Sequence, residues 1–270
     1  MRRSWRRAAP LLATALVVGT ACSGSGSEGP APLPAWPATI AGIGDSITTA
    51  AVPDREHLSA DNPELSWVTG GAEVDGHRAR VAAHDVAVTA ADVAVAGARI
   101  ADAPAQAERA VAAGADYVTF LLGANDVCAS DPPSPEVFGA GVRDALGRLE
   151  SGLSDAHVLV VSIPDVVHLR EVFAGDVRAT ATWQRTGACP AVLAGQPTED
   201  VLVAVRARQA AYDAELRAAC AEHPRCVDDG GAVAAHRFGA DEVSDVDYFH
   251  PSVAGQRRLA ALTWDAMFGR

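Results

Sequence analysis

A serine near the start of the chain has the surroundings of a catalytic nucleophile. Ser46 follows a short apolar run that ends at Gly44, so the Gly-Asp-Ser tripeptide lies on a sharp turn at the carboxyl end of a predicted strand. Ligands of open α/β sheets bind at this edge, and a glycine lets the backbone come close to a substrate. Ser46 is therefore a candidate nucleophile. The same tripeptide is ordinary turn composition, in which a serine only caps a helix, so further residues must decide.

A serine nucleophile needs a base, and one sequence pattern offers three candidates. Asp-x-x-His lets a single short segment present a histidine together with the acid that orients it. It occurs as Asp54/His57, Asp165/His168 and Asp247/His250. The first pair lies among charged neighbours in a predicted loop, whereas the second follows a predicted strand and competes with the third. The third is surrounded by aromatic residues and precedes the last helix, so we favour His250 as base and Asp247 as its orienting acid.

Two further turns end in residues that can donate hydrogen bonds to a developing oxyanion. Gly97 and the segment Gly123-Ala124-Asn125-Asp126 each follow a predicted strand. A glycine N–H and an asparagine amide beside a serine are the fixed donors that an oxyanion hole requires. Either glycine alone is only a strand-ending turn residue. Their coincidence at one sheet edge with Ser46 favours the catalytic interpretation.

The elements that must position these residues alternate between strand and helix. Strands are predicted at residues 39–44, 92–96, 117–122, 157–163 and 225–227, and helices at 104–113, 136–149, 199–221 and 252–268. Long loops at 51–80 and 165–198 are expected to shape a pocket. In the helix at 199–221 the residues expected on the buried face are Val201, Val205, Tyr212, Leu216 and Cys220. The alternation predicts a three-layer α/β/α sandwich with a mostly parallel five-stranded sheet.

The charge of the chain argues against some partners. The 270 residues include 22 basic and 34 acidic ones, with no lysine and a net charge of −12. Four arginines lie in the first seven residues, and without them 18 basic and 34 acidic residues remain. Such a surface does not suit nucleic acid, which is bound mainly by neutralising phosphates, nor does it form a basic patch for anionic lipid.

The N-terminus predicts an exported protein. Arginines precede an apolar run from Ala8 to Val18, which is too short to span a bilayer, so residues 1–21 are predicted to be a signal peptide. The following Gly-Thr-Ala-Cys resembles a bacterial lipobox, in which Cys22 is lipidated and tethers the protein to a membrane. Gly19 departs from the usual leucine or valine, so plain cleavage after Ala21 is the alternative. Residues 22–37 are expected to be a flexible tether and residues 38–270 the folded domain. We expect a location outside the cell or on the outer face of its membrane.

Four cysteines in the domain suit an oxidising compartment. Their even number allows three disulfide connectivities, of which we favour Cys128–Cys189 and Cys220–Cys226. The first would close a loop of about 60 residues, worth roughly 4 kcal/mol in the chain-entropy model. Metal binding is the alternative, but neither Cys-x-x-Cys nor clustered histidines accompany the cysteines. We therefore predict no metal site.

Together these motifs resemble the SGNH/GDSL hydrolase superfamily. Its four blocks occur in the family's order, as Gly44-Asp45-Ser46, Gly97, Gly123-Ala124-Asn125-Asp126 and Asp247-x-x-His250. Ile47 replaces the usual leucine, an apolar exchange that should leave the chemistry unchanged. The segments that resemble the phospholipase B-like branch and secreted actinobacterial lipases and esterases are Ser66-Trp67-Val68-Thr69-Gly70, Val95-Ala96-Gly97-Ala98-Arg99, Gly123-Ala124-Asn125-Asp126-Val127-Cys128, Asp229-Gly230-Gly231-Ala232-Val233 and Phe249-His250-Pro251-Ser252.

The resemblance implies a flavodoxin-like fold and a role for each matching residue. Ser46 is the nucleophile, His250 the general base and Asp247 its orienting acid. The N–H groups of Ser46 and Gly97 and the side chain of Asn125 form the oxyanion hole. An exported carboxylic-ester hydrolase that needs no cofactor is implied, with a lipid-type acyl ester as substrate, and we expect a monomer. The alternatives are a carbohydrate O-acetyl esterase of the same fold and a non-catalytic surface-binding lipoprotein.

Overall fold

The computed structural model describes residues 36–269, and its centre is a five-stranded sheet. The strands are β1 (Thr39–Gly44), β2 (Thr89–Asp92), β3 (Tyr117–Leu121), β4 (His157–Val160) and β5 (Cys226–Asp228). They are ordered β2-β1-β3-β4-β5, and every neighbouring pair is parallel. The sheet is therefore the parallel one that the sequence predicts, and its carboxyl edge collects the turns after β1 and β3.

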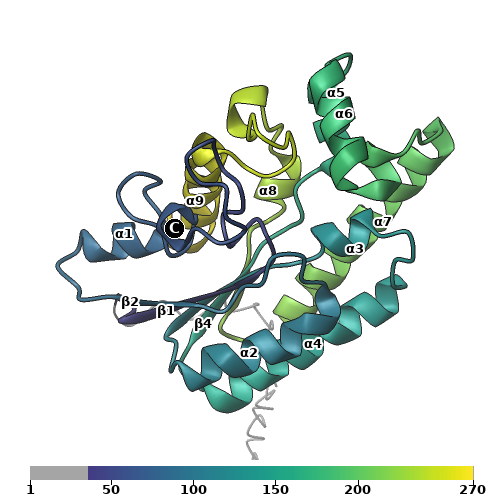
Figure 1. The fold of residues 1–270 in the computed structure, drawn as a ribbon. Coiled ribbons are helices and arrows are strands. Elements are labelled where there is room, and N and C mark those ends of the chain that lie inside the picture. The colour runs from purple at the N-terminus through teal and green to yellow at the C-terminus, as the bar shows by residue number, and fades with distance from the viewer. Residues whose placement is uncertain (1–35, 270) are drawn as a thin grey trace, which may run out of the picture.

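Helices cover both faces of the sheet (Figure 1). One face is covered by α2 (Ala103–Ala112), α4 (Pro135–Gly152) and α7 (Glu199–Ala221). The other is covered by α1 (His77–Ala82), α8 (Ala232–Ala235) and α9 (Val253–Phe268). The short α3 (Ala124–Cys128) follows β3 directly. This arrangement confirms the predicted three-layer sandwich. The bounds of the four predicted helices, which correspond to α2, α4, α7 and α9, differ from the prediction by no more than three residues at either end.

The central strand β3 shows how the two cores form. All five of its residues are buried. Val118 and Phe120 pack in the cluster with the buried residues of α2, α4 and α7, whereas Tyr117 and Leu121 pack in the cluster with those of α9. Successive side chains point to opposite faces of a strand, so a continuous apolar run fills both cores of a sheet covered on both faces.

The predicted second strand lies elsewhere. The sequence predicts it at residues 92–96, but β2 spans Thr89–Asp92 and pairs with β1 from Thr39 to Gly42. After Asp92 the chain bends, and the N–H of Val95 donates to the carbonyl of Gly44 at 3.2 Å. β2 is an edge strand without a fully buried residue, so it needs no apolar run. The prediction was placed too late in the chain because the segment after β2 is the more apolar one.

The predicted loop at residues 165–198 is mostly helical. It contains α5 (Val166–Val172), α6 (Val177–Thr186) and a π-helical turn at Pro190–Ala194. Asp165 caps α5 and Asp176 caps α6, each by accepting two backbone N–H groups. Aspartate is a favoured N-cap residue, so this signal was present in the sequence. Together α5, α6 and the turn form a projection that we call the hood, which stands out from the body of the molecule (Figure 1).

The other predicted loops contain only short helical pieces. Residues 51–80 include a 3₁₀ turn at Pro63–Leu65 and the start of α1, and 3₁₀ turns also occur at Ile100–Asp102 and Ala240–Glu242.

Two predictions for single residues are wrong or changed. In α7 one predicted core position is wrong, because Val201 is 42% exposed while the other four named residues are buried. Trp36, which the sequence analysis assigns to the tether, stacks on His84 with 3.9 Å between ring centroids.

Both favoured disulfides are present. Cys128 is bonded to Cys189 and Cys220 to Cys226. The first bond joins the end of α3 to the hood, so the segment that carries Asn125 and the hood are covalently linked. The predicted signal peptide, Cys22 and most of the tether lie outside residues 36–269. Within that range, no helix is both long and apolar enough to cross a membrane.

Candidate active site

Ser46 lies in a tight turn directly after β1. The N–H groups of Thr48 and Thr49 both donate to the carbonyl of Asp45 at 3.0 Å. A Cβ atom at Gly44 would lie only 2.1 Å from Oγ1 of Thr48, so this position requires glycine. The turn folds back on the end of β1 and leaves Ser46, which is 8% exposed, at the carboxyl edge of the sheet.

Two buried glutamines that the sequence analysis did not single out hold the backbone on either side of Ser46. Gln106 of α2 accepts the N–H of Gly44 at 2.8 Å and donates to the carbonyl of the same residue at 2.9 Å. Gln256 of α9 donates to the carbonyl of Ile47 at 2.8 Å. A polar residue in a helix is normally expected on the exposed face, so no pattern in the sequence marks either glutamine.

His250 is oriented by Asp247, the acid three residues before it. Nδ1 of His250 lies 2.6 Å from Oδ2 of Asp247. The other carboxylate oxygen, Oδ1, accepts the N–H groups of Phe249 at 2.9 Å and His250 at 3.1 Å. The carbonyl of His250 accepts the N–H of Ser244 at 2.9 Å. Both the ring and the backbone of His250 are therefore fixed before any substrate binds.

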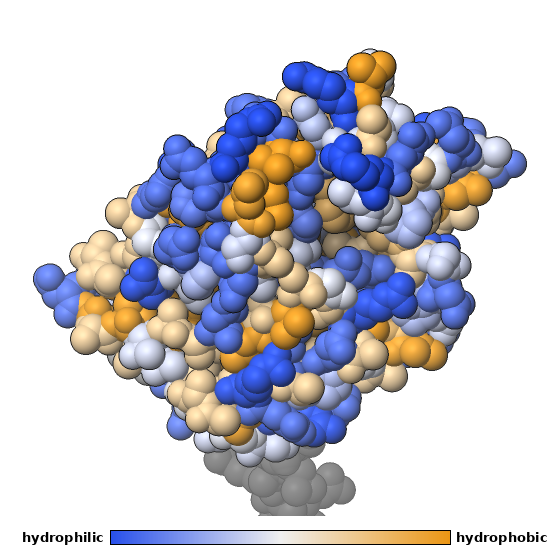
Figure 2. Space-filling view, viewed as in Figure 1, coloured by the Kyte–Doolittle hydropathy of each residue, from blue (hydrophilic) through white to orange (hydrophobic). Residues whose placement is uncertain are grey.

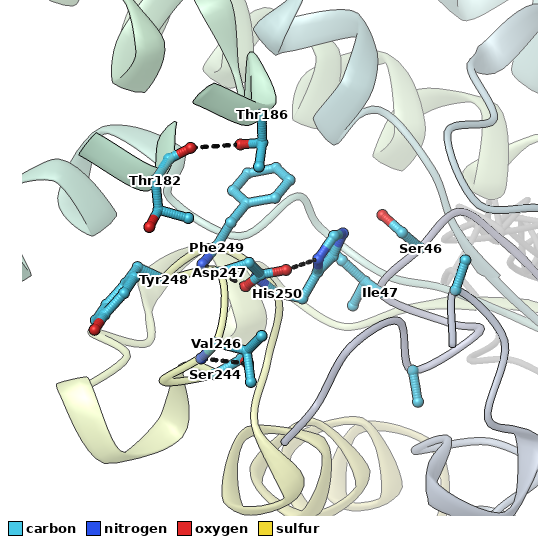
Figure 3. A network of polar contacts seen from close by, with 12 residues as sticks. Ser46, Ile47, Thr182, Thr186, Ser244, Val246, Asp247, Tyr248, Phe249 and His250 are labelled. Carbon is cyan, nitrogen blue, oxygen red and sulfur yellow. Dashed lines mark hydrogen bonds and ion pairs between the residues drawn. The ribbon is translucent and has the colours of Figure 1, made fainter. Parts of the chain in front are cut away.

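Ser46 and His250 line one cavity and face each other. In Figure 3 the Ser46 hydroxyl lies beside the imidazole, on the side of the ring away from Asp247. The cavity measures about 60 Å³. Its polar lining residues are Ser46, Asn125, Asp165, His168, Glu242 and His250, and its apolar ones are Ile47, Ala124, Pro164, Val166, Leu169, Phe238, Val243, Phe249 and Pro251. The structure thus brings together the serine and the favoured histidine from opposite ends of the domain.

The other two Asp-x-x-His segments have different surroundings. Nδ1 of His57 lies 2.9 Å from Asp54, but neither residue lines the cavity. His168 does line it, yet its Nδ1 is 3.2 Å from Glu171 and not paired with Asp165, whose carboxylate caps α5. Only Asp247 and His250 combine the acid–imidazole contact with a place beside Ser46.

The groups predicted to form an oxyanion hole lie on neighbouring turns. Asn125 lines the cavity and donates to the carbonyl of Ala98 at 3.0 Å through its Nδ2, which carries a second hydrogen. Gly97 is exposed in a left-handed conformation, with φ of 82°, and a Cβ there would meet no atom within 4 Å. Within residues 36–269 the backbone N–H groups of Ser46 and Gly97 donate no hydrogen bond. Both N–H groups are thus free to donate to a ligand.

Two buried carboxyl groups hold the backbone of the turns that form the site. Burial raises the pKa of Asp45 to about 6, and its Oδ1 accepts the N–H of Ile47 at 2.9 Å. Burial likewise raises the pKa of Asp126 to about 6, and its Oδ2 accepts the N–H of Ile100 at 3.0 Å. Asp45 fixes the turn of Ser46, and Asp126 joins α3 to the segment that follows Gly97.

Ion pairs connect the two walls of the cavity. Arg237, next to Phe238, contacts Asp165 at 2.6 Å and Glu171 at 2.8 Å. Glu171 also pairs with Arg206 of α7. These contacts hold the segment after α8 against the hood. On the surface beside the hood, hydrophobic residues lie among hydrophilic ones (Figure 2).

The hood also supports the histidine segment. Nε1 of Trp183 in α6 donates to the carbonyl of Tyr248 at 3.0 Å, and this contact is buried. Tyr248 is a non-glycine residue with a φ of 58°, a left-handed conformation that costs about 1–2 kcal/mol. The predicted loop at 165–198 does shape the pocket, although as helices, because Asp165, Val166, His168 and Leu169 line the cavity. Trp183 does not line it, and its supporting contact could not be read from its sequence position.

Comparison with known proteins shows the family of the chain. The model of the GDSL-like Lipase/Acylhydrolase family matches residues 43–258, a range that includes Ser46, Asn125 and His250. No curated protein matches the chain.

Solved structures share the fold at low sequence identity. A protein described as a GDSL-like lipase, from Parabacteroides merdae, has a TM-score of 0.58 at 15% identity, covering 88% of this chain and 99% of that one. An α/β hydrolase enzyme from the metagenome of Lake Arreo, Spain, has a TM-score of 0.56 at 17% identity, covering 86% and 96%. A lipase/acylhydrolase from Enterococcus faecalis has a TM-score of 0.50 at 18% identity, covering 83% and 92%. The chain belongs to the GDSL-like lipase/acylhydrolase family and is a carboxylic-ester hydrolase.

Proposed function

We propose that the chain is an exported serine hydrolase that cleaves carboxylic esters through an acyl-Ser46 intermediate. One observation carries the proposal: His250, held by Asp247 through one ring nitrogen, lines the same cavity as Ser46. A serine hydroxyl becomes a useful nucleophile only when an adjacent base takes its proton. The arrangement supplies such a base together with the acid that orients it.

The acylation step uses each of these groups once. Oγ of Ser46 attacks the ester carbonyl carbon, and Nε2 of His250 takes the hydroxyl proton. The carbonyl oxygen becomes an oxyanion that accepts hydrogen bonds from the N–H groups of Ser46 and Gly97 and from Nδ2 of Asn125. The tetrahedral intermediate then collapses, the bond to the alcohol oxygen breaks, and His250 returns its proton to the leaving alcohol.

Deacylation repeats the sequence with water. His250 takes a proton from a water molecule, whose oxygen attacks the acyl carbonyl. The second tetrahedral intermediate collapses, the carboxylic acid leaves, and the proton returns to Oγ of Ser46. Asp247 stabilises the imidazolium that forms in each half of the reaction.

The cavity lining favours an apolar acyl group. Most of the lining side chains are apolar, among them Leu169 and Phe249, and an apolar wall binds aliphatic chains because water is released from both surfaces. The polar side chains Asp165 and Glu242 already have partners within the protein. We therefore propose a lipid-type acyl ester as substrate, in preference to the acetyl group of a carbohydrate.

Export is proposed from the N-terminal sequence together with the disulfides. Disulfides persist in oxidising compartments, and this chain contains two. Expression of the full chain followed by fractionation tests the proposal. Wild-type protein is expected with the membrane, and Cys22→Ser is expected to release it into the medium. Equal distribution of both proteins would contradict the lipid tether, and retention of both in the cytoplasm would contradict export.

The mechanism is tested by trapping the nucleophile. A fluorophosphonate should label the wild-type protein at Ser46, as identified by peptide mass spectrometry, and should not label Ser46→Ala. The same variant should lose hydrolysis of p-nitrophenyl butyrate while its melting temperature stays unchanged. Labelling at another residue would contradict the assignment, and retained hydrolysis by Ser46→Ala would exclude an acyl-Ser46 intermediate. An inactive, unlabelled wild-type protein would favour a binding role.

The acyl group is tested with p-nitrophenyl esters of increasing chain length. If the apolar cavity binds the acyl chain, kcat/KM should rise from acetyl to at least butyrate. Activity confined to the acetyl ester would favour the carbohydrate O-acetyl esterase.

A further inference from the structure

Two glutamine side chains enclose the Ser46 turn from opposite faces of the sheet. Gln106 belongs to α2 on one face and Gln256 to α9 on the other (Figure 1), and they are 1% and 0% exposed. Each uses its amide as both donor and acceptor. Gln106 makes both of its contacts to Gly44, whereas Gln256 donates to the carbonyl of Ile47 and accepts the N–H of Trp67 at 3.0 Å.

The contacts lie two residues before Ser46 and one residue after it. The Ser46 N–H and the Cα that carries its side chain are therefore between two backbone points that are fixed from separate helices. The carbonyl of Gly44 also accepts the N–H of Val95, in the segment that leads to Gly97. Gln106 thus supports the point where two of the turns that carry the proposed oxyanion donors meet.

We propose that Gln106 and Gln256 are positioning residues that set the orientation of the Ser46 hydroxyl and N–H for the reaction. This inference rests on the proposed function, because it assigns no new reaction and concerns how the nucleophile is held. Neither glutamine lines the cavity, so both act through the backbone and not on the substrate. Small displacements of a reacting group can lower a rate about 10²-fold, which gives such support a measurable effect on kcat.

Glutamine is suited to this place because the backbone of Gly44 presents one donor and one acceptor to it. Methionine has a similar length but offers neither a strong donor nor a strong acceptor. An ionised glutamate accepts but cannot donate, and a protonated glutamate can do both. The pair Gln106→Met and Gln106→Glu therefore separates loss of volume from loss of hydrogen bonding.

The experiment measures kcat, KM and thermal unfolding for Gln106→Met, Gln106→Glu and Gln256→Met. We expect kcat on p-nitrophenyl butyrate to fall about 10- to 100-fold in both methionine variants, with KM within about threefold of wild type. The rate of fluorophosphonate labelling should fall by a similar factor. Gln106→Glu should retain more activity, relative to wild type, at pH 5.5 than at pH 8, since only its protonated form can donate to Gly44.

A third buried glutamine provides the matched control. Gln209 of α7 is 7% exposed and donates to the carbonyl of Ile163 at 2.8 Å, three residues after β4, and not to the Ser46 turn. Gln209→Met should lower the melting temperature without changing kcat by more than about twofold.

The outcomes separate the inference from the function on which it rests. Methionine variants that melt earlier but keep wild-type kcat would show a purely structural role and overturn the inference. If a methionine variant does not fold, the pH profile of Gln106→Glu decides: a ratio to wild type that does not change with pH would overturn it. A wild-type protein that neither hydrolyses esters nor reacts with the probe at Ser46 would overturn the proposed function and the inference together.

Discussion

Oδ2 of Asp247 lies 2.6 Å from Nδ1 of His250, while Oδ1 of the same carboxylate accepts the backbone N–H groups of Phe249 and His250. One oxygen therefore orients the imidazole and the other shapes the loop that carries it. The two functions can be separated by substitution, because asparagine keeps an acceptor oxygen but has no negative charge.

We predict that Asp247→Asn lowers kcat by at least about 10-fold while the fold is preserved. The amide oxygen can still cap the loop, but it cannot stabilise an imidazolium as a carboxylate does. Steady-state kinetics and a melting curve check this prediction. Wild-type kcat in Asp247→Asn would mean that His250 needs no acid.

Replacement of the histidines should single out His250 as the base. His250→Ala is expected to lower kcat by about 10²–10⁴-fold, the usual contribution of a general base. His57 does not line the cavity, so His57→Ala should leave kcat within about twofold of wild type. His168→Ala should change KM more than kcat, since His168 only lines the wall. A larger loss of kcat in His168→Ala than in His250→Ala would reassign the base.

Removal of the Asn125 amide should affect the transition state more than substrate binding. Loss of one oxyanion donor costs about 10²–10³ in kcat, so Asn125→Ala should lower kcat by that factor with little change in KM. The comparison of both constants on p-nitrophenyl butyrate is the test. A rise in KM at unchanged kcat would place Asn125 in ground-state binding only.

The buried Asp45 should make stability depend on pH in a defined direction. Burial raises its pKa from the ordinary 3.8 to about 6, so the folded state binds more protons than the unfolded state between these two values. Stability contributed by the protonated form is present below pH 4 and is lost as pH rises through about 6. Asp45→Asn cannot ionise, so its stability relative to wild type should increase between pH 4 and 8, by up to about 3 kcal/mol.

Urea unfolding at a series of pH values measures this difference. The exposed Asp131 supplies the control, since Asp131→Asn should show a difference from wild type that does not change over the same range. A relative stability of Asp45→Asn that falls with rising pH would contradict the assigned direction.

The two disulfides should contribute unequally to stability. Their sequence separations are 61 and 6 residues, and the chain-entropy model assigns roughly 4 kcal/mol to the longer loop and about 2 kcal/mol to the shorter. Double alanine substitution of Cys128 and Cys189 should therefore lower the free energy of unfolding more than that of Cys220 and Cys226. Equal losses would show that loop entropy does not determine the difference.

The strand ends and the turn residues after them could be predicted because residues of catalytic type directly follow the apolar runs that predict parallel strands. Parallel strands place their carboxyl ends at one edge, so Ser46, Gly97 and Asn125 could be placed together before their contacts were known. Periodic apolar residues likewise predicted α7 over its full length. In contrast, β2 was misplaced because an edge strand needs no apolar run.

The supporting residues could not be predicted for a different reason. Gln106 and Gln256 are polar residues in helices, and only the tertiary structure shows that they point inward. Trp183 could be expected to be buried but not to contact Tyr248. The segment of the hood, which contains Cys189 and Pro190, was predicted to be a loop, although Asp165 and Asp176 are residues that favour helix starts.

The hood begins at a firmly fixed point of the sandwich. Ile163, three residues after β4, donates its N–H to Asp213 at 2.9 Å and accepts from Gln209, both of α7. The chain rejoins the sandwich at the start of that helix. Because the hood supplies a cavity wall but neither Ser46 nor His250, a hood grafted from a relative would alter selectivity, provided that it keeps the tryptophan that supports the segment of His250. Cys189 travels with such a graft, so a recipient must offer a cysteine at the position of Cys128, or the donor cysteine must be replaced.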